Sequence, residues 1–180
     1  MDRIRNEPVF TIPNVLTMIR IALLPGVVWA FCMGDFTGAL IFYLLAMLTD
    51  AFDGYIARRF NQITQLGKLL DPIADKLSLL TLLALFVMDG QIAWWVLAIV
   101  LAKEAALVIG SAIAFKRGII VYALPIGKAT TMAFILSMIC RFARLRRTAD
   151  VLLGVSVVMS LVALVWYTVV VLEKLKLQQA

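Results

Sequence analysis

The stretch PNVLTMIRIALLPGVVWAFCM, residues 13–33, contains only one charged side chain, that of Arg20. A helix of roughly 20 apolar residues is long enough to cross the hydrocarbon core of a membrane. Five more apolar stretches follow it along the 180-residue chain. The sequence therefore predicts six membrane-spanning helices, over residues 13–33, 37–57, 69–88, 91–115, 125–143 and 149–172.

The composition favours a membrane protein of a single domain. Hydrophobic residues make up 63% of the chain and charged residues 16%, whereas soluble globular proteins have about 45–50% and about 25%. Six spans of roughly 20 residues occupy about 120 positions, which leaves short loops and no room for a second domain. We therefore expect an all-α integral membrane protein in which residues 1–180 form one domain. The same proportions exclude a soluble domain, a disordered chain and a disulfide-bonded scaffold.

The basic residues predict which side of the membrane each loop faces. The formal net charge is +6, and cytoplasmic loops are enriched in lysine and arginine. If the N-terminus is cytoplasmic, ten basic residues fall in inner segments: Arg3, Arg5, Arg58, Arg59, Lys68, Lys116, Arg117, Lys128, Lys174 and Lys176. Only four fall in outer loops: Arg141, Arg144, Arg146 and Arg147. The count predicts that both termini are cytoplasmic, and we expect the protein in a cell (inner) membrane. The four arginines in an outer loop argue against this orientation. Basic loops of this kind suit anionic lipids, so we expect membrane lipids and no nucleic acid as partners.

Carboxylates are costly inside a membrane and are usually functional there. Asp50 and Asp53 are three residues apart near the end of the second span, and Asp71 and Asp75 are four apart near the start of the third. Each spacing puts its two side chains on one face of a helix. Because the two spans are antiparallel neighbours, we expect the four carboxylates to converge at the cytoplasmic end.

Four carboxylates in one small volume cannot all ionise unless a cation lies among them. The chain has no histidine, and an oxygen-only cluster suits a hard cation such as Mg²⁺ or Mn²⁺. Four carboxylates are enough for two ions. The alternative is that the acids are helix caps or interfacial charges, and Asp71 before Pro72 does have the pattern of an N-cap. Capping, however, does not require two spaced pairs of acids.

The pattern Asp50-x2-Asp53-Gly54-x2-Ala57-Arg58-x8-Gly67-x3-Asp71-x3-Asp75 resembles the signature of the CDP-alcohol phosphotransferases. Six spans, with acids on the second and third, also fit that family over the whole chain. The resemblance implies an enzyme that moves the substituted phosphoryl group of a CDP-linked donor onto an acceptor hydroxyl and releases CMP. It also implies a homodimer whose active site faces the cytoplasm.

The resemblance further implies roles for individual residues. Asp50, Asp53 and Asp71 would bind a centre of two Mg²⁺ or Mn²⁺ ions, and Asp75 would be both a ligand and the general base. A base is needed because a hydroxyl is a poor nucleophile until its proton is removed. Residues implied in binding the CDP-linked lipid are Asn14, Thr17, Asp53, Gly54, Ala57, Arg58, Thr64 and Gly67. For Gly54 and Ala57, close helix packing through small residues is the alternative.

Two stretches indicate the donor and the acceptor. TIPNVLTMIRIALLP, residues 11–25, and LGKLLDPIADKL, residues 66–77, resemble bacterial phosphatidylglycerophosphate synthases. That resemblance implies transfer from CDP-diacylglycerol to sn-glycerol 3-phosphate. An anionic acceptor needs a basic pocket, for which the candidates are Arg20, Lys103, Lys116, Arg117 and Lys128. For Lys103 the alternative is an ion pair with Glu104 or with another span. For Lys116, Arg117 and Lys128 it is orientation of the chain by positive charge, and for Arg20 it is a side chain that reaches to the membrane interface. Lys103 and Thr130 depart from those synthases, which often have arginine and lysine there.

Two other interpretations stay open. The first is a sister enzyme with another acceptor, namely phosphatidylglycerol (as in a cardiolipin synthase), inositol phosphate or serine. The second is a cation transporter or a non-enzymatic membrane protein that uses the acids as an ion site. Transporters hold their ion sites near the middle of the membrane, often in broken helices, whereas these acids lie at one end of two spans. Release of CMP from CDP-diacylglycerol distinguishes a transferase from this second class.

Overall fold

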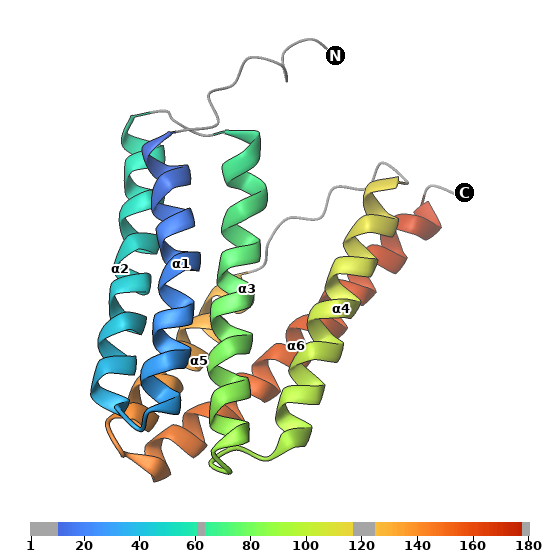
Figure 1. Ribbon diagram of the computed structural model, residues 1–180. Coiled ribbons are helices and arrows are strands. Elements are labelled where there is room, and N and C mark those ends of the chain that lie inside the picture. Colours follow the sequence, from blue (N-terminus) through green and yellow to red (C-terminus); the bar gives the residue numbers. More distant parts are fainter. Residues whose placement is uncertain (1–10, 61–63, 117–124, 178–180) are drawn as a thin grey trace. The chain divides into compact units, whose positions relative to one another are not determined.

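The computed structural model describes residues 11–60, 64–116 and 125–177, and all regular structure in these ranges is helical (Figure 1). The helices are α1 (Ile12–Cys32), α2 (Phe36–Arg59), α3 (Gln65–Met88), α4 (Trp94–Lys116), α5 (Pro125–Phe142) and α6 (Arg146–Leu177). Each of them overlaps one of the six stretches predicted from the sequence, so the six helices are confirmed. The largest differences are at α3, which begins before residue 69, and at α6, which continues beyond residue 172.

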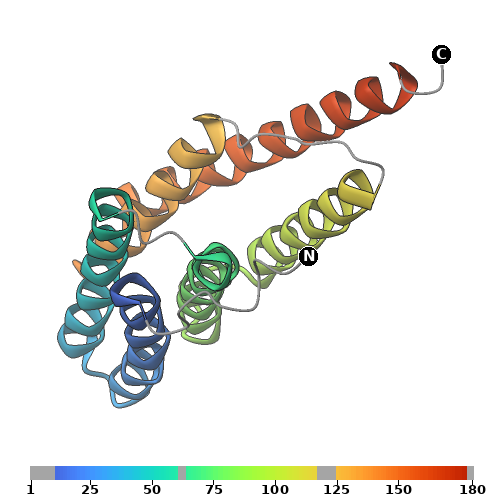
Figure 2. The same ribbon diagram turned by 90° about the horizontal axis from the view of Figure 1, so that it is seen from above.

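The first compact unit, Met1–Leu85, contains α1, α2 and most of α3. Figure 1 shows α1 and α2 running side by side in opposite directions, and Figure 2 shows α3 beside this pair. The chain reverses at Gly34, where a φ of +76° favours glycine. Asp35 then caps α2 by accepting a hydrogen bond from the Gly38 amide (2.9 Å). The hairpin brings the start of α1 to the same end of the unit as the end of α2.

The second unit, Phe86–Ala180, contains α4, α5 and α6, with α5 along the first half of α6 (Figure 2). Arg141, near the end of α5, is 3% exposed. Its guanidinium donates hydrogen bonds to the Gln91 carbonyl (2.8 Å) and to the Asp150 carboxylate (2.5 Å). Arg141 therefore connects the turn before α4 to the start of α6, and the carboxylate of Asp150 balances its charge. Of the arginines that the sequence places in outer loops, Arg144, Arg146 and Arg147 are exposed.

Many apolar side chains on the helices are exposed, as the membrane prediction requires. Trp29, Trp94 and Val151 are 65%, 73% and 66% exposed, which would be unfavourable in water. Within the described ranges, three segments have both the length and the apolar character to cross a membrane: Ile12–Cys32, Phe36–Ile56 and Arg146–Val171. These features are those of a membrane protein, while the crossing of the membrane by all six helices and the position of the termini stay predictions.

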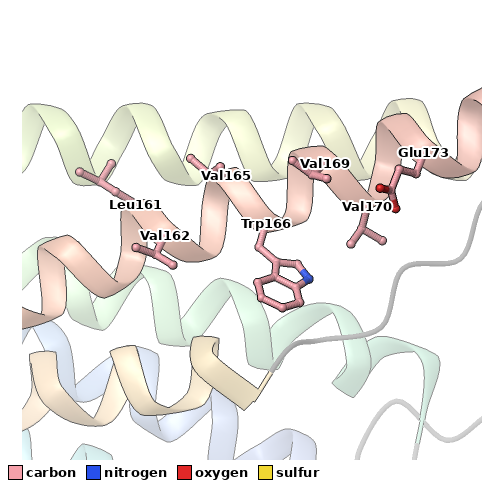
Figure 3. A pocket seen from close by; sticks show the side chains of 7 residues that line it. All are labelled: Leu161, Val162, Val165, Trp166, Val169, Val170 and Glu173. Carbon is pink, nitrogen blue, oxygen red and sulfur yellow. The ribbon is translucent and has the colours of Figure 1, made fainter.

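An apolar groove runs along the second half of α6 (Figure 3). Apart from the carboxylate of Glu173, every labelled side chain that lines it is apolar: Leu161, Val162, Val165, Trp166, Val169 and Val170. The lining holds one carboxylate and no cluster of polar groups. It does suit contact with hydrocarbon, because burial of apolar surface away from water is favourable.

Candidate functional site

The four aspartates of the sequence pattern come together at one end of the first unit. Asp50 and Asp53 lie near the end of α2, and Asp71 and Asp75 lie in the first three turns of α3. Helix α1 connects the two pairs, because its residues Thr17 and Arg20 each contact acids from both other helices. The predicted convergence of the acids is therefore confirmed.

The guanidinium of Arg20 lies among three of these carboxylates. Its Nη1 is 2.5 Å from Asp50 and 2.7 Å from Asp75, and its Nη2 forms an ion pair with Asp53. Arg20 is 2% exposed and Asp53 is 4% exposed. The side chains of Asp50 and Asp75, in contrast, are 51% and 52% exposed. The cluster is thus closed on the side of α1 and open to a substrate at Asp50 and Asp75.

The hydroxyl of Thr17 provides a second link between the acids. It lies 2.8 Å from Asp71 Oδ1 and 3.2 Å from Asp53 Oδ2, and 3.1 Å from the Pro13 carbonyl of its own helix. A hydroxyl has one proton to donate, and the shortest of the three distances is to Asp71. Thr17 is fully buried, so this hydrogen bond fixes the start of α3 against α1.

The position of Asp71 excludes the capping alternative for that residue. Because α3 begins at Gln65, Asp71 and Pro72 lie within the helix and not at its N-terminus. Thr64 is the capping residue instead, since its hydroxyl accepts a hydrogen bond from the Gly67 amide (2.9 Å). Asp71 is therefore free of a capping role and faces the cluster through Thr17.

Next to the acids, three residues implied in donor binding contact one another. The Thr64 hydroxyl is 3.0 Å from the Asn14 side-chain oxygen, and both residues are buried. Gly67 has to be glycine for this contact, because a Cβ there would lie 2.7 Å from Asn14 Oδ1 and 3.1 Å from Thr64 Oγ1. The structure therefore brings Asn14, Thr64 and Gly67 together, while their role in donor binding stays a prediction.

We expect Gly67→Ala to destabilise the protein by roughly 1–3 kcal/mol, because the added methyl group would force the buried Asn14 side chain to move. The matched control is Gly154→Ala in α6, where a Cβ would meet nothing within 4 Å. Alanine is the better helix former by about 1 kcal/mol, so the control should be neutral or stabilising. Thermal unfolding in detergent measures both variants, and equal unfolding temperatures for the two would refute the close contact at Gly67.

The chemistry of the cluster fits a hard divalent cation. The four acidic side chains offer only oxygen atoms, which Mg²⁺ and Mn²⁺ prefer. Three of the carboxylates contact the guanidinium of Arg20, and the fourth, that of Asp71, contacts the hydroxyl of Thr17. Among the described residues, no group of three or more acids, histidines or cysteines is arranged to hold a metal ion directly. Arg20 contacts three of the acids instead. The residues that would hold an ion are therefore present, and the guanidinium of Arg20 lies among them.

Other predicted donor-binding residues lie on α2. Gly54 is half-buried, one residue after Asp53. Ala57 and Arg58 belong to the same helix, but their side chains lie outside the described residues. Their predicted contacts with the donor therefore stay predictions.

Of the five basic residues predicted to bind the acceptor, the structure describes the side chains of Arg20 and Lys103. Arg20 contacts the acids, and Lys103 lies in the second unit, where its Nζ is 2.5 Å from the Glu104 carboxylate. Lys103 and Glu104 are 9% and 8% exposed, so this pair is buried. Arg117 and the side chains of Lys116 and Lys128 lie outside the described residues.

Comparison with known proteins agrees with this geometry. Residues 10–172 match the sequence profile of the CDP-alcohol phosphatidyltransferase family. The matched range contains the four aspartates, and it also contains Arg20. The resemblance inferred from the spacing of the acids is therefore confirmed.

Individual relatives carry two different names. The chain is 37% identical, over 139 residues, to a cardiolipin synthase (CMP-forming) of Streptomyces coelicolor. It is 43% identical over 91 residues to the CDP-diacylglycerol–glycerol-3-phosphate 3-phosphatidyltransferase of Escherichia coli, and 51% identical over 70 residues to that of Rickettsia bellii. The alignments cover 72%, 48% and 37% of this chain. They cover 63%, 49% and 38% of the relatives' own lengths, so the chain matches part of each relative.

Proposed function

The chain belongs to the CDP-alcohol phosphatidyltransferase family, and on this basis we propose that it transfers the phosphatidyl group of CDP-diacylglycerol to sn-glycerol 3-phosphate. The products are phosphatidylglycerophosphate and CMP. The observation that carries the proposal is the convergence of two pairs of aspartates from α2 and α3, of which Asp50, Asp53 and Asp75 contact the buried Arg20 and Asp71 contacts Thr17. Relatives named for this reaction, at 43% and 51% identity over part of the chain, support the choice of acceptor.

In the proposed mechanism, the aspartates would hold the metal ions and Asp75 would accept the proton of the acceptor hydroxyl. Two Mg²⁺ or Mn²⁺ ions, held by the four aspartates, would neutralise the pyrophosphate and the charge that develops on CMP. Asp75 is half-exposed at the open side of the cluster, where its carboxylate takes the proton of the acceptor hydroxyl. The hydroxyl oxygen then forms a bond to the lipid-linked phosphorus, the bond from that phosphorus to CMP breaks, and CMP leaves with the electron pair.

The other residues of the cluster would position the donor. Asn14 and Thr64 contact each other beside the acids, and Gly54 lies on α2 next to Asp53. These groups offer hydrogen bonds and space to the soluble CMP end of the donor, as the resemblance implies. A site at helix ends suits a substrate with a polar head and two acyl chains, because it meets both water and lipid.

We place this site on the cytoplasmic side of a cell (inner) membrane, with six spans and both termini in the cytoplasm. The excess of basic residues in the inner segments supports this orientation. The balanced charge of Arg141 adds support, because it weakens the opposing arginine run. A homodimer is proposed from the family resemblance alone.

A second candidate is the transfer of the phosphatidyl group to phosphatidylglycerol, which would yield cardiolipin. It is favoured by the Streptomyces coelicolor relative, whose alignment covers 72% of this chain. The buried ion pair of Lys103 with Glu104 also favours it, because a paired lysine is less available to a phosphate. Inositol phosphate and serine are further acceptors to be tested.

The test offers purified protein CDP-diacylglycerol and Mg²⁺ with each acceptor separately: sn-glycerol 3-phosphate, phosphatidylglycerol, inositol 1-phosphate or serine. CMP release gives the rate, and mass spectrometry identifies the lipid formed. We expect sn-glycerol 3-phosphate to be preferred and phosphatidylglycerophosphate to form. Preference for phosphatidylglycerol would transfer the assignment to cardiolipin synthesis. Absence of CMP with every acceptor, from folded protein, would favour the non-enzymatic alternative.

A further inference from the structure

Arg20 is a buried cation whose recorded partners, among the described residues, are all carboxylates. It reaches from α1 to Asp50 and Asp53 on α2 and to Asp75 on α3. Its Nε is also buried and has no hydrogen-bond partner in the part of the chain that the structure describes. The acids are therefore the groups that hold this guanidinium in place.

The same carboxylates are the proposed ligands of the divalent ions. An oxygen that forms an ion pair with Arg20 offers less negative charge to a metal, and the buried guanidinium takes up space between the acids. We propose that Arg20 is a counter-ion of the aspartates, an inference that rests on the proposed function. In the metal-free protein Arg20 holds the aspartates together, and it competes with the divalent ions for their carboxylates. Arg20 is thus a positioning residue that regulates the metal site.

This arrangement has a physical rationale. Four carboxylates close together repel one another, and a buried charge without a partner is strongly destabilising. Asp53 is buried and has no basic partner other than Arg20 recorded among the described residues. The site would therefore be unstable before metal binds unless a cation of the chain neutralised it. Once ions supply the positive charge, the guanidinium is no longer required at the acids.

The proposal predicts opposite effects of Arg20→Met on stability and on metal affinity. The metal-free variant should unfold at a lower temperature than the wild type, because Asp53 loses its ion pair. The Mg²⁺ concentration that gives half of the thermal stabilisation should fall by about tenfold or more, because charge-assisted contacts no longer compete. Arg20→Gln, which keeps a hydrogen-bond donor but no charge, should behave in the same way. Arg20→Lys restores a charge and should move the Mg²⁺ requirement back toward that of the wild type.

The experiment uses the full chain in detergent, stripped of metal by a chelator, with Mg²⁺ or Mn²⁺ added back while thermal unfolding is followed. The matched control is Arg141→Met, which removes an equally buried arginine that is paired with Asp150 in the second unit. The control should lower the unfolding temperature by a similar amount with and without metal, and it should leave the half-saturating Mg²⁺ concentration unchanged.

The outcomes separate this inference from the proposed function. If metal does not stabilise the wild type, the proposed metal site itself is wrong. If metal stabilises the wild type but the Arg20 variants have the same half-saturating concentration, Arg20 is only structural and the inference fails. A variant that can be purified only with metal present supports the inference. If Arg20→Met does not fold even with metal present, the half-saturating Mg²⁺ concentration of Arg20→Gln decides. If Arg20→Gln does not fold with metal either, the inference is overturned.

Discussion

Replacement of Asp75 by asparagine is expected to lower the turnover of CDP-diacylglycerol by about 10²–10⁴-fold, the usual contribution of a general base. Asparagine has nearly the same shape but cannot accept the proton of the acceptor hydroxyl. The family resemblance implies Asp75 as the base, and its carboxylate is half-exposed at the open side of the cluster, as a base that meets a substrate needs to be. CMP release at saturating concentrations of both substrates measures the effect.

The control for this variant is Asp89→Asn, which changes an exposed carboxylate just beyond the other end of α3, where Asp89 contacts Gln91. It should leave turnover within about twofold of the wild type, since surface substitutions have small effects. Metal-dependent thermal stabilisation should persist in Asp75→Asn, although at a higher Mg²⁺ concentration, because a neutral amide oxygen replaces one of the four proposed ligands. A folded Asp75→Asn protein that retained more than a tenth of wild-type turnover would refute the assignment of the base.

The second large effect is expected at Asp71, as a loss of metal affinity. Asp71→Asn replaces a charged ligand by a neutral amide, and even changes to the surroundings of a ligand cost about 10–100-fold in metal affinity. We therefore expect the Mg²⁺ concentration for half-maximal CMP release to rise by at least about tenfold. The contact with Thr17 should survive, because the amide oxygen of asparagine still accepts a hydrogen bond from that hydroxyl.

A matched variant for Asp71 is Asp35→Asn. Asp35 caps α2 at the opposite end of the hairpin, and asparagine is an equally good N-cap. Its Mg²⁺ requirement should equal that of the wild type. If Asp71→Asn and Asp35→Asn required the same Mg²⁺ concentration, Asp71 would not be a metal ligand.

The helices could be predicted from the sequence where apolar residues define them, and less well where other forces act. α1 is within one residue of its predicted range because its apolar stretch ends at the Gly34 turn. α3 begins earlier than predicted because Thr64 caps a first turn that contains polar residues, which a count of apolar residues does not detect. α6 continues past residue 172 because charged residues such as Glu173 are good helix formers.

The convergence of the aspartates was predictable from the sequence, whereas the contact of Arg20 with them was missed. The spacing of the acids was sufficient to predict their convergence, because residues three or four apart share a helix face. The contact of Arg20 with the acids was not, since it joins residues 30 or more positions apart. One signal was available: Asn14, Thr17 and Arg20 recur at every third position of an otherwise apolar helix. Thr17 and Arg20 of this polar stripe contact both α2 and α3.

Measuring both products of the wild-type protein is the decisive test of a metal-dependent transfer of a phosphatidyl group. Purified protein is stripped of metal and given CDP-diacylglycerol and sn-glycerol 3-phosphate, before and after addition of Mg²⁺. We predict no reaction without Mg²⁺ and, with it, CMP and phosphatidylglycerophosphate in equal amounts. CMP without a new phospholipid, or no CMP at all from folded protein with Mg²⁺ and any of the four acceptors, would show that the protein is not a phosphatidyltransferase.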